Sequence, residues 1–347
     1  MGRFWSAHPG LCSQQDGRFP SGTDPVSICA WRHTVPIAVS ISYAPLTKTA
    51  VFGLLNVNKP NGLTSRDVVN RVQRIVKPLK VGHAGTLDPL ADGVLMVTIG
   101  PATRLTEYIQ RMPKAYRATF LLGRTSDTED ILGNVIEMDE PSIPTPTELA
   151  AAVPQFVGQI SQRPPAYSAL KVKGKRAYQR AREGEQFTLK ARPIRIDHIE
   201  IESYHYPELT LVIGCGSGTY VRSLGRDLAV AVNTGAVMSA LTRTAIGHFE
   251  LAKSTPLDAI TPESLPDRLL SPVEAVSELP HVLINESDQL RLQTGQAVSY
   301  EGVESAQLAA VDETGALLAI LQRREENPRC PQEYIPVRNF SARPNQR

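Results

Sequence analysis

The segment from Gly82 to Leu95 constrains the fold more than any other part of the chain. It reads Gly-His-Ala-Gly-Thr-Leu-Asp-Pro-Leu-Ala-Asp-Gly-Val-Leu. Its three glycines and its proline disfavour a regular helix or a central strand. The apolar run 94–99 that follows is typical of a buried strand. The sequence therefore predicts a shaped loop beside a rigid sheet, with Asp88 on that loop.

Asp88 has two interpretations at this point. An aspartate that precedes a proline commonly forms an Asx turn, which is a purely structural role. A carboxylate on a constrained loop beside a sheet is also in a common position for a catalytic group. Spacing alone does not separate these interpretations.

The composition indicates an ordinary soluble globular protein. The chain has 347 residues, of which 21% are charged and 41% hydrophobic, and its formal net charge is +2. This length allows one large domain or two, and the small net charge means that a nucleic-acid partner must be argued from local clusters. Four cysteines without a Cys-x-x-Cys spacing predict neither a zinc site nor a disulfide framework. A reducing, cytosol-like compartment follows, and no apolar run reaches the length of a membrane span.

Residues 1–50 differ from the rest of the chain. They mix Gly, Pro, Ser and scattered aromatic residues with few charges and no sustained period. We expect a poorly ordered N-terminal extension, or a start site placed too far upstream. A targeting peptide is a further alternative, although the continuous apolar core of a secretory signal is absent.

Hydrophobic periodicity predicts a unit that mixes helices and strands. Strands are expected at 52–58, 115–123, 194–204 and 209–215. One helix is expected after Thr64 or Ser65, either of which can cap it, and a second from about Tyr220. The buried stripe of the second helix is expected to consist of Val221, Leu224, Leu228 and Val232.

The glycine-rich turn at 214–219 raises the alternative of a nucleotide-dependent enzyme. A strand, a Gly-x-Gly turn and a helix together suggest a dinucleotide-binding loop, but Thr219 stands where the fingerprint requires glycine. The chain also contains no Gly-x-x-x-x-Gly-Lys-Ser/Thr string. The match therefore fails, and ATP use is not indicated.

The segment 163–182 is the densest basic stretch of the chain. It contains no acidic residue, and Tyr167 and Tyr178 lie between the basic ones. A basic run is usually a solvated surface, but positive charge with aromatic rings also suits a phosphate-rich, partly unstacked RNA. The basic residues are Arg163, Lys171, Lys173, Lys175, Arg176, Arg180 and Arg182.

Several of these strings together resemble the motifs of one enzyme family. Asn-Lys-Pro-x-Gly-x-Thr-Ser comes first, Gly-Thr-Leu-Asp-Pro-Leu-Ala second and Gly-Thr-Tyr-Val-Arg near the end. They are similar to the motifs of the TruB family of pseudouridine synthases, which modify the T-loop of transfer RNA. The resemblance covers about residues 52–251, and its segments are 58–65, 82–95, 115–130, 163–182, 218–224 and 240–247.

The resemblance implies an α+β fold, the pseudouridine synthase fold. Its bent, mixed and mainly antiparallel sheet is flanked by helices and has a central cleft. The catalytic domain would be residues 51–255, with an RNA-contacting thumb at 163–190. A proline-rich linker would follow at 256–278, and a small β-rich, PUA-like domain with a tail at 279–347. A hairpin of 306–312 with 316–322 fits that domain, and an inert β-rich cap is the alternative.

The implied reaction is the isomerisation of uridine to pseudouridine at position 55 of tRNA. It needs base flipping and the exchange of a C–N for a C–C glycosidic bond, with no cofactor and no metal. By the resemblance Asp88 is the catalytic carboxylate, as a nucleophile or by taking a proton from the sugar. Arg222 is its partner, since a nearby guanidinium opposes the effect of desolvation on the carboxyl pKa. Tyr220 is the base that removes the C5 proton.

The remaining site residues follow from the same resemblance. Tyr116 would stack on the uracil, a contact worth roughly 1–3 kcal/mol per base. His83 would pack where the flipped base was, Leu241 would line the pocket with Tyr220, and Lys59 would support the loop. Lys171, Lys173, Lys175, Arg176 and Arg180 would bind the RNA.

The implied partner is the T-arm of tRNA. No membrane and no obligate protein partner are expected, and the enzyme would be a cytoplasmic monomer. The alternative is a non-catalytic tRNA-binding or tRNA-folding protein that uses the same basic surface. Such a protein would have no need of the Asp88–Arg222 pair.

Overall fold

The computed structural model describes residues 52–168, 170–172, 175–183, 185, 187, 189–300, 302–324 and 332–340. The extension expected at 1–50 lies outside these residues, as does Lys173 of the basic segment. Across the described part of the chain, no helix combines the length and apolarity that crossing a membrane requires.

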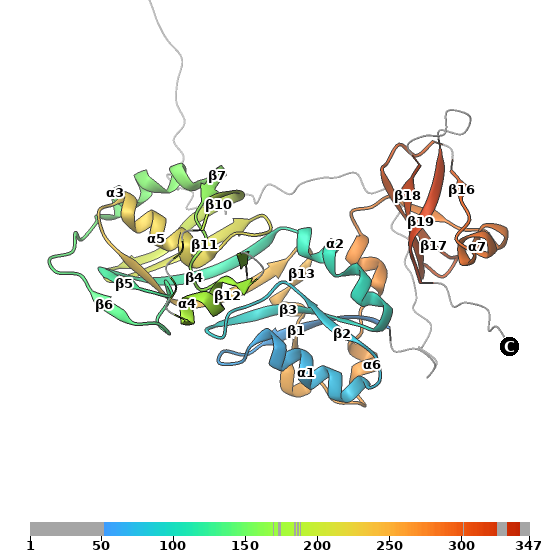
Figure 1. Ribbon diagram of the computed structural model, residues 1–347, viewed down its shortest axis with the longest axis horizontal. Coiled ribbons are helices and arrows are strands. Elements are labelled where there is room, and N and C mark those ends of the chain that lie inside the picture. Colours follow the sequence, from blue (N-terminus) through green and yellow to red (C-terminus); the bar gives the residue numbers. More distant parts are fainter. Residues whose placement is uncertain are drawn as a thin grey trace, which may run out of the picture. The chain divides into compact units, whose positions relative to one another are not determined.

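A ten-stranded mixed sheet forms the centre of the larger, N-terminal part of the described chain (Figure 1). Two of its strand pairs, β1 with β14 and β3 with β12, are parallel, and the other pairs are antiparallel. The main path is, in spatial order, β14 (Thr255–Pro256), β1 (Gly53–Lys59), β3 (Ala91–Ile99), β12 (Ala236–Ile246), β4 (Lys114–Leu122), β11 (Glu208–Cys215), β10 (Arg192–His205) and β7 (Gly158–Gln162). Off this path, β2 (Val81–Ala84) pairs with β3, and β13 (Phe249–Glu250) pairs with β12. The predicted α+β class with a mainly antiparallel mixed sheet is confirmed.

The helices are short and lie against the sheets or in the connections between strands (Figure 1). The α-helices are α1 (Ser65–Val76), α2 (Thr106–Arg111), α3 (Pro146–Ala152), α4 (Ala177–Arg182), α5 (Val221–Ala231), α6 (Leu265–Arg268) and α7 (Glu286–Gln293). The 3-10 helices are η1 (Gly100–Leu105), η2 (Val153–Phe156), η3 (Leu251–Lys253), η4 (Leu257–Ala259) and η5 (Pro272–Val276). Helix α1 begins where the sequence predicts, because Thr64 and Asp67 form a reciprocal capping box.

Helix α5 packs tightly on β4. All four residues of its predicted apolar stripe are buried. Gly225, on the same helix, lies so close to Phe120 that an added Cβ would be 2.0 Å from the ring. The missing side chain therefore sets how closely the first turn of α5 approaches the sheet.

The loop expected over 82–95 is shorter than predicted. Gly82 lies within β2 and Gly93 within β3, so only 85–90 is outside the strands. The prediction that the glycines exclude strands there is wrong, because Gly93 serves a cross-strand fit. Its φ is +94°, and an added Cβ would lie 2.3 Å from the carbonyl oxygen of Arg243 on β12.

The proline-rich segment 256–278 is packed against the sheet. It contains η4, α6 and η5. Leu257, Ile260 and Leu265 belong to one apolar cluster with residues of α1 and β1. Prolines in this segment therefore mark short turns and helix starts.

A second, five-stranded sheet forms the C-terminal part, as expected from the sequence. The predicted hairpin is present as the antiparallel pair of β17 and β18. In spatial order the strands are β15 (His281–Leu283), β17 (Gln307–Val311), β18 (Leu317–Arg323), β19 (Glu333–Asn339) and β16 (Val298–Ser299).

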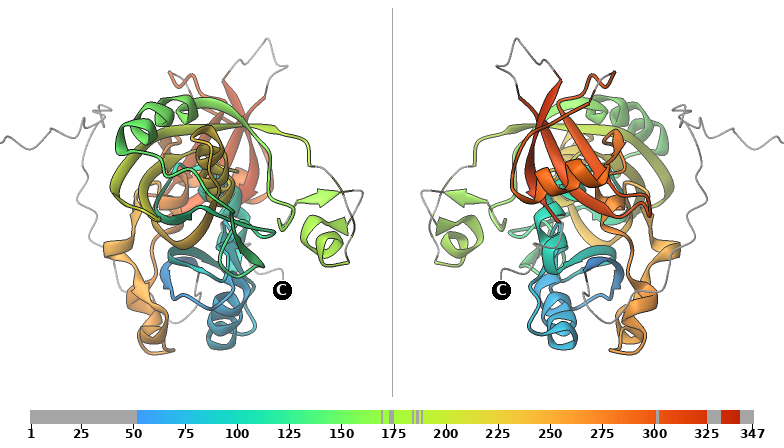
Figure 2. Two further views of the ribbon diagram at one scale, coloured as in Figure 1. Left: turned by 90° about the vertical axis from the view of Figure 1, so that its left-hand side faces the viewer. Right: turned by 90° about the vertical axis from the view of Figure 1, so that its right-hand side faces the viewer.

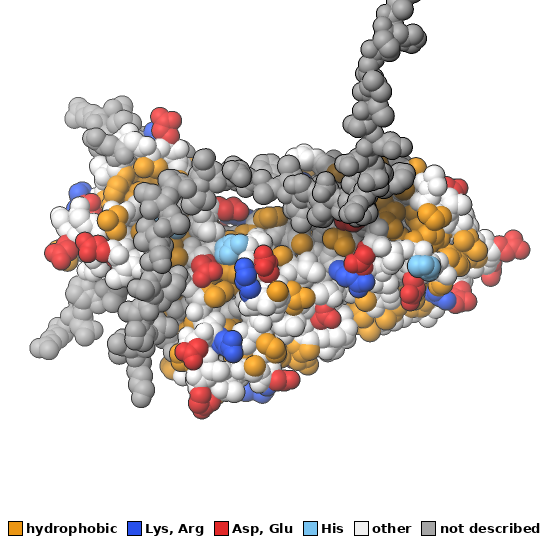
Figure 3. Space-filling model, turned by 180° about the vertical axis from the view of Figure 1, so that it is seen from behind, with side chains coloured by type: hydrophobic (Ala, Val, Ile, Leu, Met, Phe, Trp, Pro, Cys, Tyr) orange, Lys and Arg blue, Asp and Glu red, His pale blue; other side chains and the backbone are white. Residues whose placement is uncertain are grey.

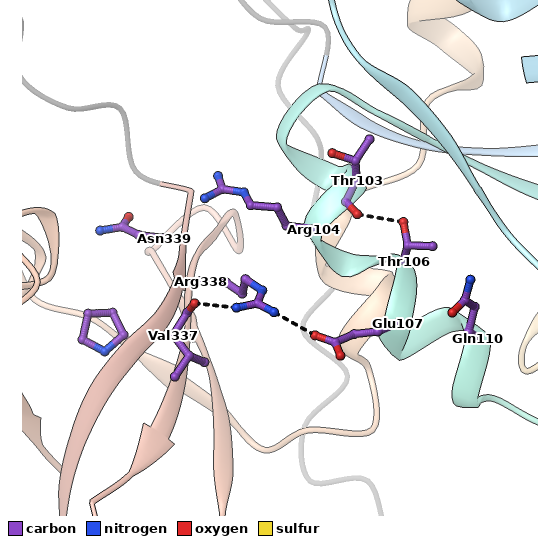
Figure 4. A pocket seen from close by; sticks show the side chains of 9 residues that line it. Thr103, Arg104, Thr106, Glu107, Gln110, Val337, Arg338 and Asn339 are labelled. Carbon is purple, nitrogen blue, oxygen red and sulfur yellow. Dashed lines mark hydrogen bonds and ion pairs between the residues drawn. The ribbon is translucent and has the colours of Figure 1, made fainter. Parts of the chain in front are cut away.

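A polar groove lies between η1 and α2 on one side and β19 on the other (Figure 4). Arg338 donates a hydrogen bond to Glu107 of α2 at 3.1 Å. Arg104 lies over the ring of Phe340, with its guanidinium carbon 4.8 Å from the ring centre. An ion pair and a cation–π contact are therefore among the contacts between the two sides of the groove.

Two small hairpins lie outside the main sheets. The first pairs β5 (Arg124–Ser126) with β6 (Val135–Glu137), and the second pairs β8 (Lys171–Val172) with β9 (Lys175–Arg176). The second hairpin and α4 project from the sheet (Figure 2). On the face shown in Figure 3, acidic and basic side chains lie interspersed, without a concentration of basic ones among the described residues.

The contact between Gly225 and Phe120 gives a stability prediction. We expect Gly225→Ala to lower the free energy of unfolding by about 1–3 kcal/mol, because overpacking must move the ring or the helix. Urea unfolding measures the change. Val230→Ala, on an exposed position of the same helix, is the control and should change stability by less than about 0.5 kcal/mol. Equal stability of the two variants would contradict the close contact.

Candidate active site

The loop that carries Asp88 is tied to the turn between β1 and α1. The turn supplies one side-chain hydroxyl, one side-chain amide and one backbone N–H to this loop. The hydrogen bonds are Leu87 N to Ser65 Oγ (2.8 Å), Ser65 Oγ to Leu87 O (3.1 Å), Asn61 Nδ2 to Leu90 O (2.6 Å) and Gly62 N to Pro89 O (2.8 Å). The first sequence motif therefore fixes the backbone on both sides of Asp88.

Lys59 supports this turn from inside. Its side chain is fully buried, and its ammonium donates to the carbonyl oxygens of Pro60 at 2.9 Å and Leu63 at 2.6 Å. Burial lowers the pKa of Lys59, and the negative charges of Asp92 and Asp88 oppose that effect. The ammonium acts on the shape of the turn and has no exposed surface to offer a substrate.

Arg222 holds the carboxylate of Asp88. The distance from Nε of Arg222 to Oδ2 of Asp88 is 3.0 Å. The two side chains differ in exposure, since 36% of the Asp88 side chain is accessible and only 7% of Arg222 is. The acid is thus open to a ligand, whereas its partner is covered. The predicted pair is brought together by α5 and the loop before β3.

The same guanidinium has three further contacts. Its Nη1 lies 3.6 Å from Oδ2 of Asp130 and donates to the carbonyl oxygen of Thr128 at 2.5 Å. Its Nη2 donates to the carbonyl oxygen of Tyr167 at 3.1 Å. Arg222 therefore joins the Asp88 loop, the segment after β5 and the base of the basic segment.

Asp130 was not assigned a role from the sequence. It is buried and accepts hydrogen bonds from the hydroxyl of Thr128 at 2.6 Å and the backbone N–H of Leu132 at 3.0 Å. The sequence could have indicated Asp130 through its place in the segment 115–130, which resembles a family motif. In that segment only Tyr116 was assigned a role. Its contact with Arg222 depends on folding and is not visible as a local pattern.

Tyr116 forms part of the wall beside the acid. Its ring is 9% exposed and belongs to one apolar cluster with Leu87, Leu90 and Leu241. Burial raises the pKa of Tyr116, and the positive charge of Arg243 opposes that effect. Two of the predicted pocket residues, Tyr116 and Leu241, thus lie in the cluster that contains loop residues on both sides of Asp88.

Tyr220 is placed at the start of α5. Its backbone N–H donates to Gln162 at 2.9 Å, and the Gln162 amide donates back to the Tyr220 carbonyl at 3.0 Å. The guanidinium of Arg192 lies over its ring, 5.1 Å from the centre. No hydrogen bond or ion pair joins this side chain to Asp88 within the described residues.

His83 lies on β2, opposite Val97 of β3. Burial lowers the pKa of His83, with the positive charge of Arg66 as the next cause. Its Nδ1 is buried without a hydrogen-bond partner. For the part of the chain that the structure covers, His83 has neither a hydrogen bond nor an ion pair with Asp88.

The structure describes only part of the basic segment 163–190. Arg180 pairs with Glu185 at 2.5 Å and lies over the ring of Phe187, 5.0 Å from its centre. The side chains of Lys171, Lys175 and Arg176, like all of Lys173, lie outside the described residues. Among the residues that are described, no group of three or more His, Cys, Asp or Glu side chains could hold a metal ion.

Comparison with known proteins identifies the class of enzyme to which this site belongs. Residues 73–221 match the model of the TruB family pseudouridylate synthase, N-terminal domain. The tRNA pseudouridine synthase B of Mycobacterium sp. (strain KMS) is 38% identical over 303 residues, which cover 82% of this chain and 96% of the relative. That of Acaryochloris marina (strain MBIC 11017) is 41% identical over 68% of this chain and 82% of the relative.

A solved structure agrees with these matches. The crystal structure of a Cbf5-Nop10-Gar1 complex contains a chain with a TM-score of 0.65 and 25% identity, over 84% of this chain and 86% of that chain. The chain belongs to the TruB family of pseudouridylate synthases. It is accordingly an isomerase that forms pseudouridine from uridine.

The lowered pKa of His83 gives a prediction for stability against pH. The unfolded chain binds this proton at the ordinary pKa of 6.5, and the folded protein binds it only at lower pH. The free energy of unfolding should therefore fall as the pH drops below 6.5, by at most about 1.4 kcal/mol per pH unit, until the folded imidazole is protonated.

We expect His83→Gln to remove this part of the slope. Urea unfolding of both proteins at about pH 5.5 and about pH 7.5 measures it. Above pH 6.5 the imidazole is neutral in both the folded and the unfolded state. The difference in free energy of unfolding between the variant and the unmodified protein should therefore not change with pH there. An identical slope below pH 6.5 in the two proteins would contradict the prediction.

Proposed function

We propose that the enzyme acts on tRNA and isomerises the uridine at position 55, in the T-loop, with Asp88 as the reacting carboxylate. The observation that carries this proposal is the Asp88–Arg222 pair, an accessible acid held at 3.0 Å by a covered guanidinium. A carboxylate inside a site that excludes water needs such a partner to stay ionised. The names of the relatives, tRNA pseudouridine synthase B, support tRNA as the substrate.

In the proposed mechanism the target nucleotide first leaves its stack. Extrusion costs a few kcal/mol and less in a loop than in a duplex. The uracil then lies against the ring of Tyr116 and beside Leu241, whose side chains are already fixed in the apolar cluster. His83 fills the place that the base has left.

Asp88 then acts on the nucleotide, either as a nucleophile or by taking a proton from the sugar. The C–N glycosidic bond breaks, the base turns, and its C5 forms a bond to C1′ of the sugar. Tyr220 removes the proton from C5 and the released N1 gains a proton, so that atoms balance without a redox partner. Reactant and product are isomers, and no external donor enters the reaction.

The basic segment 163–190 is proposed as the part that closes on the RNA. Its base is anchored to α5, since the carbonyl oxygens of Arg163 and Tyr167 accept hydrogen bonds from Arg226 and Arg222. Beyond this anchor the β8–β9 hairpin and α4 project from the sheet (Figure 2). A charged, projecting arm suits contact with a phosphate backbone.

We further propose that residues 279–347 act as a PUA-like RNA-contacting module. The enzyme is proposed to work as a monomer in the cytoplasm, with the T-arm of tRNA as its partner. Light scattering during gel filtration, with and without tRNA, tests the one-to-one complex.

The role of Asp88 is tested by Asp88→Asn. We expect turnover in a tritium-release assay on unmodified tRNA to be lost, because a neutral amide cannot act as the nucleophile or the base. Binding of tRNA should be largely unchanged, since Asp88 offers no positive charge to the phosphates. Asp258→Asn, at an exposed surface pair with Arg71, is the control. A variant at position 88 that still converts uridine would rule out the proposal.

The basic segment is tested by the double change Lys173→Glu with Lys175→Glu. We expect weaker tRNA binding and a shallower dependence of affinity on salt. The logarithmic slope should fall by about 0.7–0.9 for each phosphate that the lysines no longer neutralise. Filter binding at several salt concentrations measures the slope. If the slope is the same as in the unmodified protein, these lysines do not contact the RNA.

A further inference from the structure

We propose that Arg243 is a positioning residue for the reaction. Its buried guanidinium holds the backbone on both sides of the Asp88 loop, and it is the register partner of Tyr116 on the next strand. The inference rests on the proposed role of Asp88, and it assigns a function to a side chain that does not itself touch the substrate.

The guanidinium of Arg243 donates hydrogen bonds to the backbone on both sides of the Asp88 loop. Its Nε donates to the carbonyl oxygen of Val94 at 2.7 Å, and its Nη2 donates to that of Gly85 at 3.1 Å. Gly85 directly follows β2, and Val94 lies in β3 after the loop has rejoined the sheet. Asp88 lies between these two anchored residues, so the side chain fixes the width of the loop that presents the acid.

The backbone on both sides leaves room for this side chain. Gly85 has a φ of +93°, and an added Cβ would lie 3.4 Å from Nη1 of Arg243. Gly93 is paired with Arg243 in the parallel β3–β12 ladder, and it lies close to the backbone of Arg243. Two of the three glycines that mark this segment in the sequence thus lie where Arg243 approaches the chain.

Arg243 also connects the loop to the base-contacting side of the site. Strand β12 lies between β3 and β4 (Figure 1), and Arg243 is the register partner of Tyr116 on β4. The positive charge of Arg243 acts on the Tyr116 hydroxyl and opposes the rise of its pKa. Arg243 therefore lies between the loop of the acid and the strand that carries the ring proposed to hold the uracil.

The charge of Arg243 is unusual for so buried a residue. Its exposed fraction is 1%, and among the described residues no carboxylate forms an ion pair with it. A buried charge without a counterion is costly unless hydrogen bonds satisfy it, and here the backbone carbonyls of Gly85 and Val94 accept such bonds. Lysine is not an equivalent replacement, because all its donors are on one nitrogen, whereas the guanidinium reaches the two carbonyls from two separate nitrogens.

The test compares Arg243→Met and Arg243→Lys with the unmodified enzyme in tritium release from tRNA. We expect Arg243→Met to lower kcat by about 100-fold, the effect of misplacing a reacting group by about 1 Å. KM and tRNA affinity should change by less than about threefold. Arg243→Lys should fall between the two, because it keeps the charge and one of the bonds.

Ile246→Ala is the matched control. Ile246 is buried on the same strand, in a cluster that includes Val94 but no residue proposed to contact the substrate, and its truncation should cost stability without lowering kcat. A loss of kcat in this control as large as in Arg243→Met would overturn the inference, since general destabilisation would then explain both. A kcat within about threefold of normal in Arg243→Met would overturn it as well.

Hydrogen exchange without substrate separates this inference from the role of Asp88. The amides of Leu87 and Ala91, bonded to Ser65 and Asp88, should exchange faster in Arg243→Met, while those of β1 stay protected. Unchanged exchange at both amides would overturn the inference. Faster exchange together with an active Asp88→Asn variant would support loop positioning and overturn only the proposed function of Asp88.

Discussion

The guanidinium of Arg222 is the group on which the site depends. It is almost fully covered, yet it contacts two carboxylates and two backbone carbonyls. A buried cation is tolerated only when such partners are supplied. The loop of Asp88, the segment of Asp130 and the base of the basic segment therefore have to converge on the first turn of α5. The close approach of Gly225 to Phe120 holds that turn against the sheet.

The sheet brings together segments that are far apart in the sequence. Strand β12 is inserted between β3 and β4, and this order puts Leu241 opposite Ala91 and Arg243 opposite Tyr116. The rigid centre thus carries residues that line the candidate site, and a loop carries Asp88, the carboxylate proposed to react. Such a division is typical of enzymes whose reacting groups are positioned by a scaffold.

Local physics predicted the parts of the fold that depend on near neighbours. The helix start after Thr64 or Ser65, the strand at 209–215 and the apolar stripe of α5 follow from residues within one or two turns. The Asp88–Arg222 pair followed only from the family resemblance. The contacts of Asp130 and Arg243 could not be predicted, because they arise between strands and loops that no local pattern connects. The prediction that Gly93 excludes a strand was wrong for the same reason, since the residue that it fits against, Arg243, lies on another strand.

The hydrogen bond from Arg222 to the carbonyl oxygen of Tyr167 has a consequence for selectivity. The arm that is proposed to grip the RNA and the acid that is proposed to react share one cation. A poorly fitting RNA that twisted the arm would tilt this cation and, with it, the carboxylate. Discrimination between RNAs would then appear in how fast a bound molecule is converted rather than in how tightly it is held.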